Sequence, residues 1–146
     1  MGILKMGWKL DWCKFAKYLS EKYHVNKMFV FIGYLTENKK FYELLRSFGF
    51  ILIFRPITRN ADGKIKWNCD CDMALYISFK MHNYKSAVIV TSDGDFYSAI
   101  RLLVRRKKLR VVLSPNIHTC SKLLSIEAKG NIVHMNNFKE KLQFTK

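Results

Sequence analysis

The sequence predicts an α/β fold in which a parallel sheet is covered by helices on both faces, and three observations lead to this class. Segments with a helical pattern of apolar residues alternate with short apolar segments along the chain. The short segments are apolar throughout, not at every second residue, which is typical of strands buried on both faces. The length of 146 residues suits one domain with a sizeable core.

The first half of the chain supplies two of the expected strands and two helices. In order, these are a helix over 11–23, a strand over 28–34, a helix over 38–49 and a strand over 50–56. Asp11 can cap the start of the first helix, because its carboxylate can accept from free amides there. Gly49 is placed to end the second helix, and Pro56 stops the second strand because it lacks an amide donor.

The second half repeats the alternation after a polar loop with a turn expected at Asp62-Gly63. The expected elements are a helix from about Asp70 to Met81, a strand over 86–92, a helix from Phe96 to Val104, a strand over 109–114, a helix over 119–128 and a strand over 131–135. The helix that starts at Asp70 is apolar on most sides, so we expect it to be well buried.

Charge is the most informative bulk property. Twenty-six Lys and Arg face eleven Asp and Glu, which gives a formal net charge of +15. This excess favours a polyanionic partner, most often nucleic acid, although a basic protein with a solvated surface is the alternative. No apolar run reaches the ~20 residues of a membrane span, and no signal-peptide segment opens the chain. We therefore expect a cytoplasmic protein without a membrane partner.

The four cysteines leave two interpretations open. In a cytoplasmic protein they are thiols, and we expect them to be buried. A zinc site built from Cys69, Cys71, His118 and Cys120 is the alternative, although the C-x-C spacing is unusual for structural zinc.

Acids are scarce in the second half of the chain and occur in pairs. Over residues 63–126 there are only four, Asp70 with Asp72 and Asp93 with Asp95. The first pair opens a predicted helix and the second follows a predicted strand, so both can face the edge where the carboxyl ends of parallel strands meet. Grouped carboxylates repel one another unless a cation offsets their charge. Oxygen ligands suit Mg²⁺ or Mn²⁺, and such an ion can polarise a phosphate and activate a water.

Each of these acids also has an ordinary structural interpretation. Asp70 can cap a helix, Asp72 can be a favourable charge in its first turn, and Asp93 can belong to a simple turn. Thr91 and Ser92 could orient a phosphate or a metal-bound water, but hydroxyls are common at strand ends. The pattern therefore supports a metal–phosphate site without requiring one.

Several basic and aromatic residues are candidates for binding nucleic acid. Lys64 and Lys66 lie in the loop that leads to Asp70, and Trp67 beside them could stack on a base or pack on the sheet. Arg105 and Arg106 begin the run RRKKLR, which is either a solvated helix end or a phosphate-binding rim.

The segments GKIKWNCDCDMAL and AVIVTSDGDFYSAIRLL, with FIGY and LIFRP before them, carry a resemblance to a known family. From about Leu10 to Leu142 the chain resembles the NYN domain family, the LabA-like branch of the PIN-like nucleases. The family pattern K-G-N-x-D corresponds to residues 66–70, and S-G-D-G-D-F corresponds to residues 91–96. Trp67 and Ser92 stand where the family has glycines.

The resemblance implies a Rossmann-like three-layer α/β/α sandwich with a mainly parallel sheet, the PIN-like fold. It also implies a Mg²⁺ or Mn²⁺ site that cuts RNA. Asp70, Asp93 and Asp95 match the catalytic and metal-binding acidic positions of the family. Asn68, Asp72, Thr91 and Ser92 are neighbours of these acids, in supporting roles.

The start of the chain departs from the family pattern. The family opens with a central strand that ends in an aspartate, in a pattern like F-I-D-G-x-N, whereas MGILKMGWKLDW contains no such segment. We therefore expect the middle strand and one metal-binding carboxylate to be missing. The gap predicts lower stability or a partner, including a second copy of the chain, that supplies a strand. It also leaves two functions open, a weakened metal-dependent ribonuclease and a non-catalytic RNA-binding module.

Overall fold

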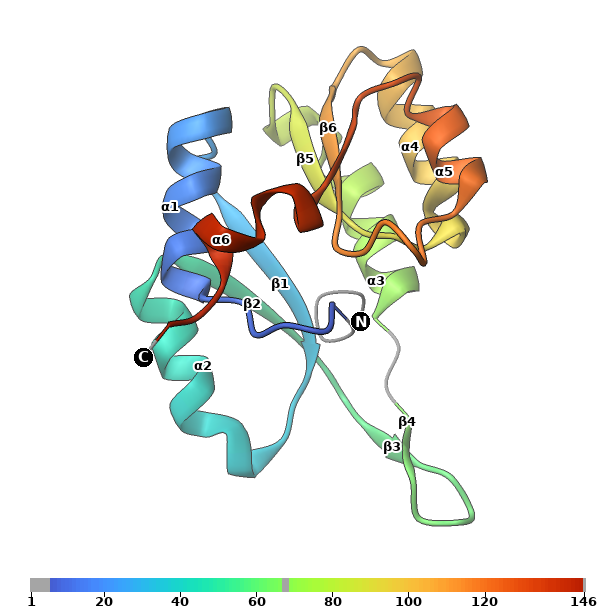
Figure 1. Ribbon diagram of the computed structural model, residues 1–146. Helices are drawn as coiled ribbons and strands as arrows, with labels where there is room; N and C mark the ends of the chain where they lie inside the picture. Colours follow the sequence, from blue (N-terminus) through green and yellow to red (C-terminus); the bar gives the residue numbers. More distant parts are fainter. Residues whose placement is uncertain (1–5, 67–68, 146) are drawn as a thin grey trace. The chain divides into compact units, whose positions relative to one another are not determined.

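The computed structural model describes residues 6–66 and 69–145, which divide into two compact units (Figure 1). Trp12–Met73 form the N-terminal unit, and Ala74–Lys146 form the C-terminal unit together with Met1–Asp11. Helix α3 (Asp70–Phe79) begins in the first unit and ends in the second. That the two units form a single domain stays a prediction.

The N-terminal unit contains the four elements expected of the first half. They are α1 (Trp12–Tyr23), β1 (Met28–Gly33), α2 (Lys39–Ser47) and β2 (Phe50–Arg55), with the short 3-10 helix η2 (Thr36–Asn38) before α2. The two strands are parallel and in register over their whole lengths. Trp12 packs edge-on against Phe50, with ring centroids 5.5 Å apart, and so fastens α1 to the start of β2.

The loop after β2 folds into a small antiparallel hairpin of β3 (Thr58–Arg59) and β4 (Ile65–Lys66) (Figure 1). Its turn confirms the expectation for Asp62-Gly63. Gly63 has a φ of +82°, and the Lys64 amide donates to Asp62 Oδ1 over 3.1 Å. The two strands were not expected, because each is only two residues long with polar neighbours and so forms no recognisable apolar run.

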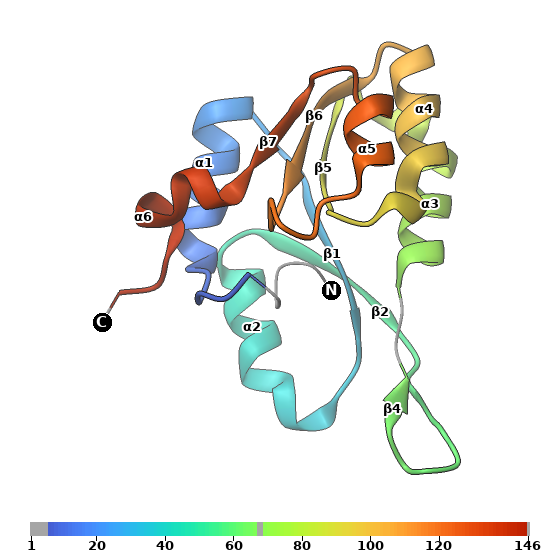
Figure 2. The same cartoon turned by 45° about the vertical axis from the view of Figure 1, so that its right-hand side comes forward.

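The C-terminal unit contains a parallel sheet in the order β5-β6-β7. Its strands are β5 (Ala87–Val90), β6 (Leu109–Ser114) and β7 (Ile132–His134); its helices are α4 (Tyr97–Arg105), α5 (Lys122–Glu127) and α6 (Lys139–Leu142), with the 3-10 turns η3 (Met81–Asn83), η4 (Gly94–Phe96) and η5 (Met135–Phe138). Helices α4 and α5 lie side by side on one face of this sheet (Figure 2). Ile100, Leu103 and Leu124 are fully buried there and form much of the core.

Parallel strands joined by helices confirm the predicted α/β class. That a middle strand is missing stays a prediction. Within the described chain β5 pairs only with β6, so no described strand occupies its other edge. A partner or second copy that supplies a strand stays a prediction.

Helix α3 is less buried than its apolar sequence predicts. It was expected to be well buried, yet Ile77 is its only buried residue among those described. Leu75 and Phe79, one turn apart, are 54% and 80% exposed. A helix that is apolar on most sides needs neighbours all round, and α3 packs through only one of its sides.

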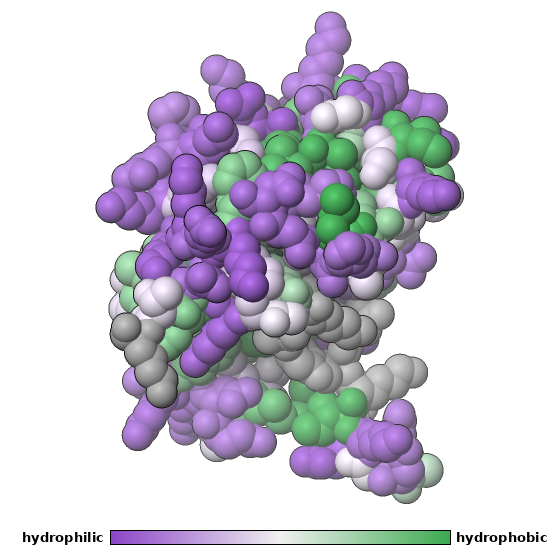
Figure 3. Space-filling view, viewed as in Figure 1, coloured by the Kyte–Doolittle hydropathy of each residue, from purple (hydrophilic) through white to green (hydrophobic). Residues whose placement is uncertain are grey.

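The cysteines differ in their exposure to solvent. Cys69 is buried, but Cys13 and Cys71 are exposed, so the expectation of buried thiols is wrong for these two. Hydrophilic residues cover most of the face shown in Figure 3, as the charge of the chain requires. No helix in the described residues is long and apolar enough to span a membrane.

Candidate active site at the carboxyl end of β5

The second acidic pair lies in a tightly bonded turn directly after β5. The Asp93 amide donates to Thr91 Oγ1 over 3.1 Å, and the Asp95 amide donates to Asp93 Oδ1 over 2.9 Å. The Asp93 carboxylate therefore caps η4, which continues into α4. Both aspartates are exposed, and no Lys or Arg of the described chain comes within 4.0 Å of either carboxylate.

A buried serine pair anchors this turn to the neighbouring strand. Ser92 Oγ lies 2.9 Å from Ser114 Oγ, where β6 ends, and also accepts from the Asn116 amide over 3.3 Å. The Ser92 carbonyl accepts from the Ser121 amide over 3.1 Å. Thus Ser92, which stands where the family has glycine, holds together the segments that follow β5 and β6. Sequence reasoning missed Ser114, although its place at the end of a predicted strand was a usable signal.

Gly94 occupies the narrowest point of the turn. A Cβ at this residue would lie 2.5 Å from Ser121 Oγ and 3.0 Å from Ser121 Cβ. Its φ is not in the left-handed region, so any residue could adopt the backbone. Glycine is required here by space, because the segment before α5 passes directly over the turn.

The first acidic pair begins α3 in the N-terminal unit. Asp70 is the first residue of the helix, and Asp72 pairs with Arg55, with Nε and Oδ2 3.5 Å apart. Arg55, Asp72 and Cys69 line a cavity of about 130 Å³ at the end of β2. Burial raises the pKa of the Cys69 thiol, and the Asp72 carboxylate raises it further. Asp72 is thus engaged by Arg55, a residue that sequence reasoning did not single out.

The donors fit a hard divalent cation in kind, because carboxylate oxygens are what Mg²⁺ and Mn²⁺ prefer. Asp93 and Asp95 supply two carboxylates in the C-terminal unit, whereas Asp70 lies in the N-terminal unit. Among residues 6–66 and 69–145, no three His, Cys, Asp or Glu side chains group so that they could hold a metal ion. The meeting of Asp70, Asp93 and Asp95 at one ion therefore stays a prediction, and so does the zinc alternative.

The predicted nucleic-acid contacts fall in different places. Lys64 is exposed on the hairpin and Lys66 belongs to β4, while Trp67 and Asn68 lie outside the described residues. Arg105 and Arg106 are exposed at the end of α4, nine residues of helix away from the acidic turn. At 1.5 Å per residue this is about 13 Å along the helix, and a role of the two arginines as a phosphate-binding rim stays a prediction.

A parallel α/β unit with an acidic turn at a strand end belongs to the class of domains that place their sites at the carboxyl edge of the sheet. The chain is a member of the NYN domain family, whose model matches residues 3–132. Members of this family are inferred to be ribonucleases, and they typically bind metal.

A solved structure supports the fold alone. A protein of unknown function from Vibrio parahaemolyticus superposes on this chain with a TM-score of 0.74 at 20% sequence identity, over 94% of this chain and 83% of that one. No curated protein matches the sequence.

Proposed function

We propose that the chain is a metal-assisted ribonuclease-type domain that acts on the phosphodiester backbone of RNA. The acidic turn after β5 carries this proposal. It holds two exposed carboxylates without a cationic partner in the described chain, in a protein with 26 Lys and Arg. Membership of the NYN family supports RNA as the substrate class.

Each residue has a distinct part in the proposal. Asp93 and Asp95, with Asp70, would hold Mg²⁺ or Mn²⁺, and the ion would polarise the phosphate and lower the pKa of a bound water. Thr91 and Ser92 fix the turn through their hydroxyls. Lys64, Lys66, Trp67, Arg105 and Arg106 would contact flanking parts of the RNA.

The test is cleavage of a labelled single-stranded RNA in the presence of Mn²⁺. We expect Asp93→Asn to reduce cleavage to background and to abolish its dependence on metal. Glu140→Gln removes one negative charge from an exposed position of the same unit and serves as the matched control. Equal cleavage by wild type and Asp93→Asn, with metal or without it, would refute the proposal.

A non-catalytic RNA-binding module is the second candidate. It is favoured by the lack of a third grouped carboxylate in the described residues and by the net charge of +15. It predicts RNA binding that weakens steeply with salt and that Asp93→Asn leaves equal or tighter, because the substitution removes a repulsive charge. Absence of cleavage together with such binding would decide for this candidate.

A further inference from the structure

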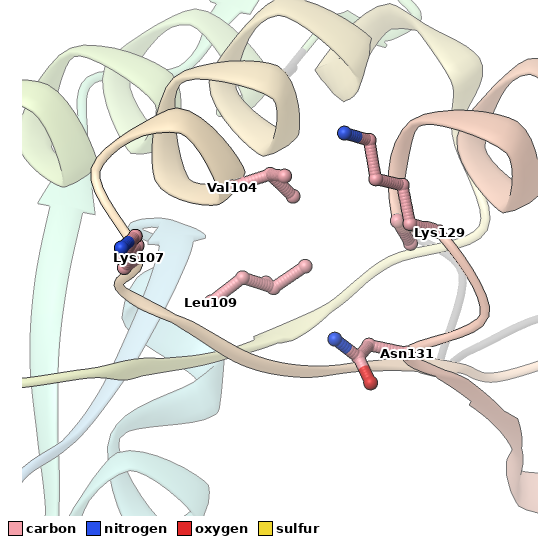
Figure 4. A pocket seen from close by; sticks show the side chains of 6 residues that line it. Val104, Lys107, Leu109, Lys129 and Asn131 are labelled. Carbon is pink, nitrogen blue, oxygen red and sulfur yellow. The ribbon is translucent and has the colours of Figure 1, made fainter.

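A second pocket lies in the C-terminal unit, at the opposite edge of the sheet from the acidic turn. It has a volume of about 270 Å³ and is lined by Val104, Lys107, Leu109, Ala128, Lys129 and Asn131 (Figure 4). Lys107 lies between α4 and β6, Leu109 is the first residue of β6, and Lys129 and Asn131 lie between α5 and β7. The pocket therefore sits where β6 and β7 begin, whereas the acidic turn follows the end of β5. The six residues of β6 separate these two edges by roughly 17 Å.

The two lysines of this pocket share an unusual backbone conformation. Lys107 has a φ of +58° and Lys129 a φ of +50°. In the described chain only His24 joins them as a non-glycine residue with positive φ. Each lysine directly follows the last turn of a helix, a position that glycine commonly fills because it has no Cβ to strain. Attraction to the carbonyl end of a helix favours a cation nearby, but it does not require that cation to take the strained position.

Neither ammonium group forms an ion pair within the described residues, although Lys129 joins Arg101 and Arg105 in lowering the pKa of the Glu127 carboxyl. Both lysines are exposed, and no carboxylate in the described residues lies within 4.0 Å of either one. Glu127, the acid nearest in sequence to Lys129, is bound by Arg101, whose Nε donates to Oε2 over 3.1 Å. This hydrogen bond lowers the pKa of the Glu127 carboxyl, so the acid is already engaged at neutral pH.

The remaining lining residues give the pocket a mixed chemistry. Val104 and Leu109 form the apolar part of the lining and lie between the two lysines, with Lys107 on the α4 side and Lys129 on the α5 side (Figure 4). The Asn131 side chain lies at its border and offers both a donor and an acceptor. The volume is below the 300–1,000 Å³ or so of enclosed ligand sites, so it suits part of a nucleotide.

We propose that this pocket binds one phosphate of a single-stranded RNA at its lysine-bearing rim, through Lys107 and Lys129 on its two sides, with the adjoining sugar or base over Val104 and Leu109. The proposal rests on RNA as the partner in the proposed function, but not on cleavage. An RNA strand that reaches from this pocket to the acidic turn crosses one face or edge of the C-terminal unit. The pocket then holds the RNA at a distance from the phosphodiester bond that is cut. Binding at two separate places is how a protein fixes the register of a flexible strand.

The conformation of the two lysines permits a sharp test. Substitution of both by glycine removes the charges and at the same time relieves the positive-φ strain, so we expect the fold to be retained, and the melting temperature checks this. The control is Lys85→Gln with Lys141→Gln, which removes two charges from exposed positions that do not line the pocket. The full chain is titrated with single-stranded RNA by fluorescence anisotropy at several salt concentrations.

We expect the Lys107→Gly, Lys129→Gly variant to bind RNA about tenfold more weakly, as for the loss of charge-assisted contacts. Its plot of log affinity against log salt should be shallower by about 0.7, the value for one phosphate on a single strand. Its melting temperature should equal or exceed that of wild type. An affinity no lower than that of the control variant would overturn the proposal.

A titration with uridine monophosphate, followed by amide NMR shifts, locates the site without any cleavage. We expect changes in the amide chemical shifts of residues 104–109 and 128–131. They should be retained in Asp93→Asn and lost in the double glycine variant. If those shifts persist while no RNA is cut, only the proposed cleavage fails. Shifts confined to other segments, or inorganic phosphate that binds as tightly as the nucleotide, would refute the pocket as an RNA site.

Discussion

Alanine at Gly94 tests the close packing that shapes the acidic turn. The backbone there tolerates alanine, and replacing glycine in a helical turn by alanine should stabilise by about 0.5–1 kcal/mol. Against this, the new Cβ would meet Ser121 Oγ at 2.5 Å and Ser121 Cβ at 3.0 Å. Forcing a methyl group into a packed site typically costs about 1–3 kcal/mol. We expect the steric cost to win, with a net loss of about 1–2 kcal/mol in the free energy of unfolding.

The second step of this test is a rescue at Ser121. Ser121 precedes α5, but its side chain makes no capping hydrogen bond, so Ser121→Gly alone should cost only a few tenths of a kcal/mol. In combination with Gly94→Ala it removes both atoms that the new methyl would meet. A double-mutant cycle from urea denaturation should therefore show a coupling of about 1–2 kcal/mol. A Gly94→Ala variant as stable as wild type, or one that Ser121→Gly does not restore, would refute the packing argument.

Three further predictions concern single interactions in the same unit. Because Arg101 lowers the pKa of Glu127, the carboxylate should stabilise the fold above pH 4.5 and lose that effect as the pH falls. The stability difference between wild type and Glu127→Gln, measured by denaturation, should therefore be present at pH 7 and shrink in acid. A difference that grows in acid would contradict this prediction. Ser92→Ala should cost about 1–3 kcal/mol, because the buried Ser114 hydroxyl and the half-buried Asn116 amide each lose a partner, and adding Ser114→Ala should cost less than Ser114→Ala alone; strict additivity would argue against the pair. Lys108→Met should cost about 2–3 kcal/mol in a thermal or urea melt, because its ammonium donates over 2.7 and 2.6 Å to two backbone carbonyls before β5, whereas the same change at an exposed lysine should cost almost nothing.

The order of helices and strands was predictable from the sequence because it depends on local patterns. Apolar runs such as 50–56 and 86–92 became parallel strands, and Gly49 ended its helix in a left-handed conformation, with a φ of +96°. The acidic turn was predictable for the same reason, since two aspartates directly after a buried strand fall at its carboxyl end whatever the rest of the chain does.

Contacts between distant segments were not predictable in this way. Ser92 and Ser114 are 22 residues apart, and they meet only because β5 and β6 pair in one particular register. The pairing of Arg55 with Asp72 likewise depends on where β2 ends relative to the first turn of α3. Lys108 belongs to a run that looked solvated, yet its ammonium is bonded to carbonyls of another segment. Each case needs the tertiary arrangement, which a pattern in one segment does not contain.

Gly94 and the two lysines at positive φ show why residue type alone misleads. At Gly94 a residue chosen for conformational freedom has an ordinary backbone and is required by a neighbouring side chain. At Lys107 and Lys129 the backbone would accept glycine more readily, and charged side chains stand there instead. Both exceptions lie next to surfaces that we propose to bind RNA, one at each edge of the same sheet. Strain or crowding in a fold is kept only where another interaction offsets its cost. Positions that depart from the usual residue preferences of their backbone therefore indicate functional surfaces better than positions that follow them.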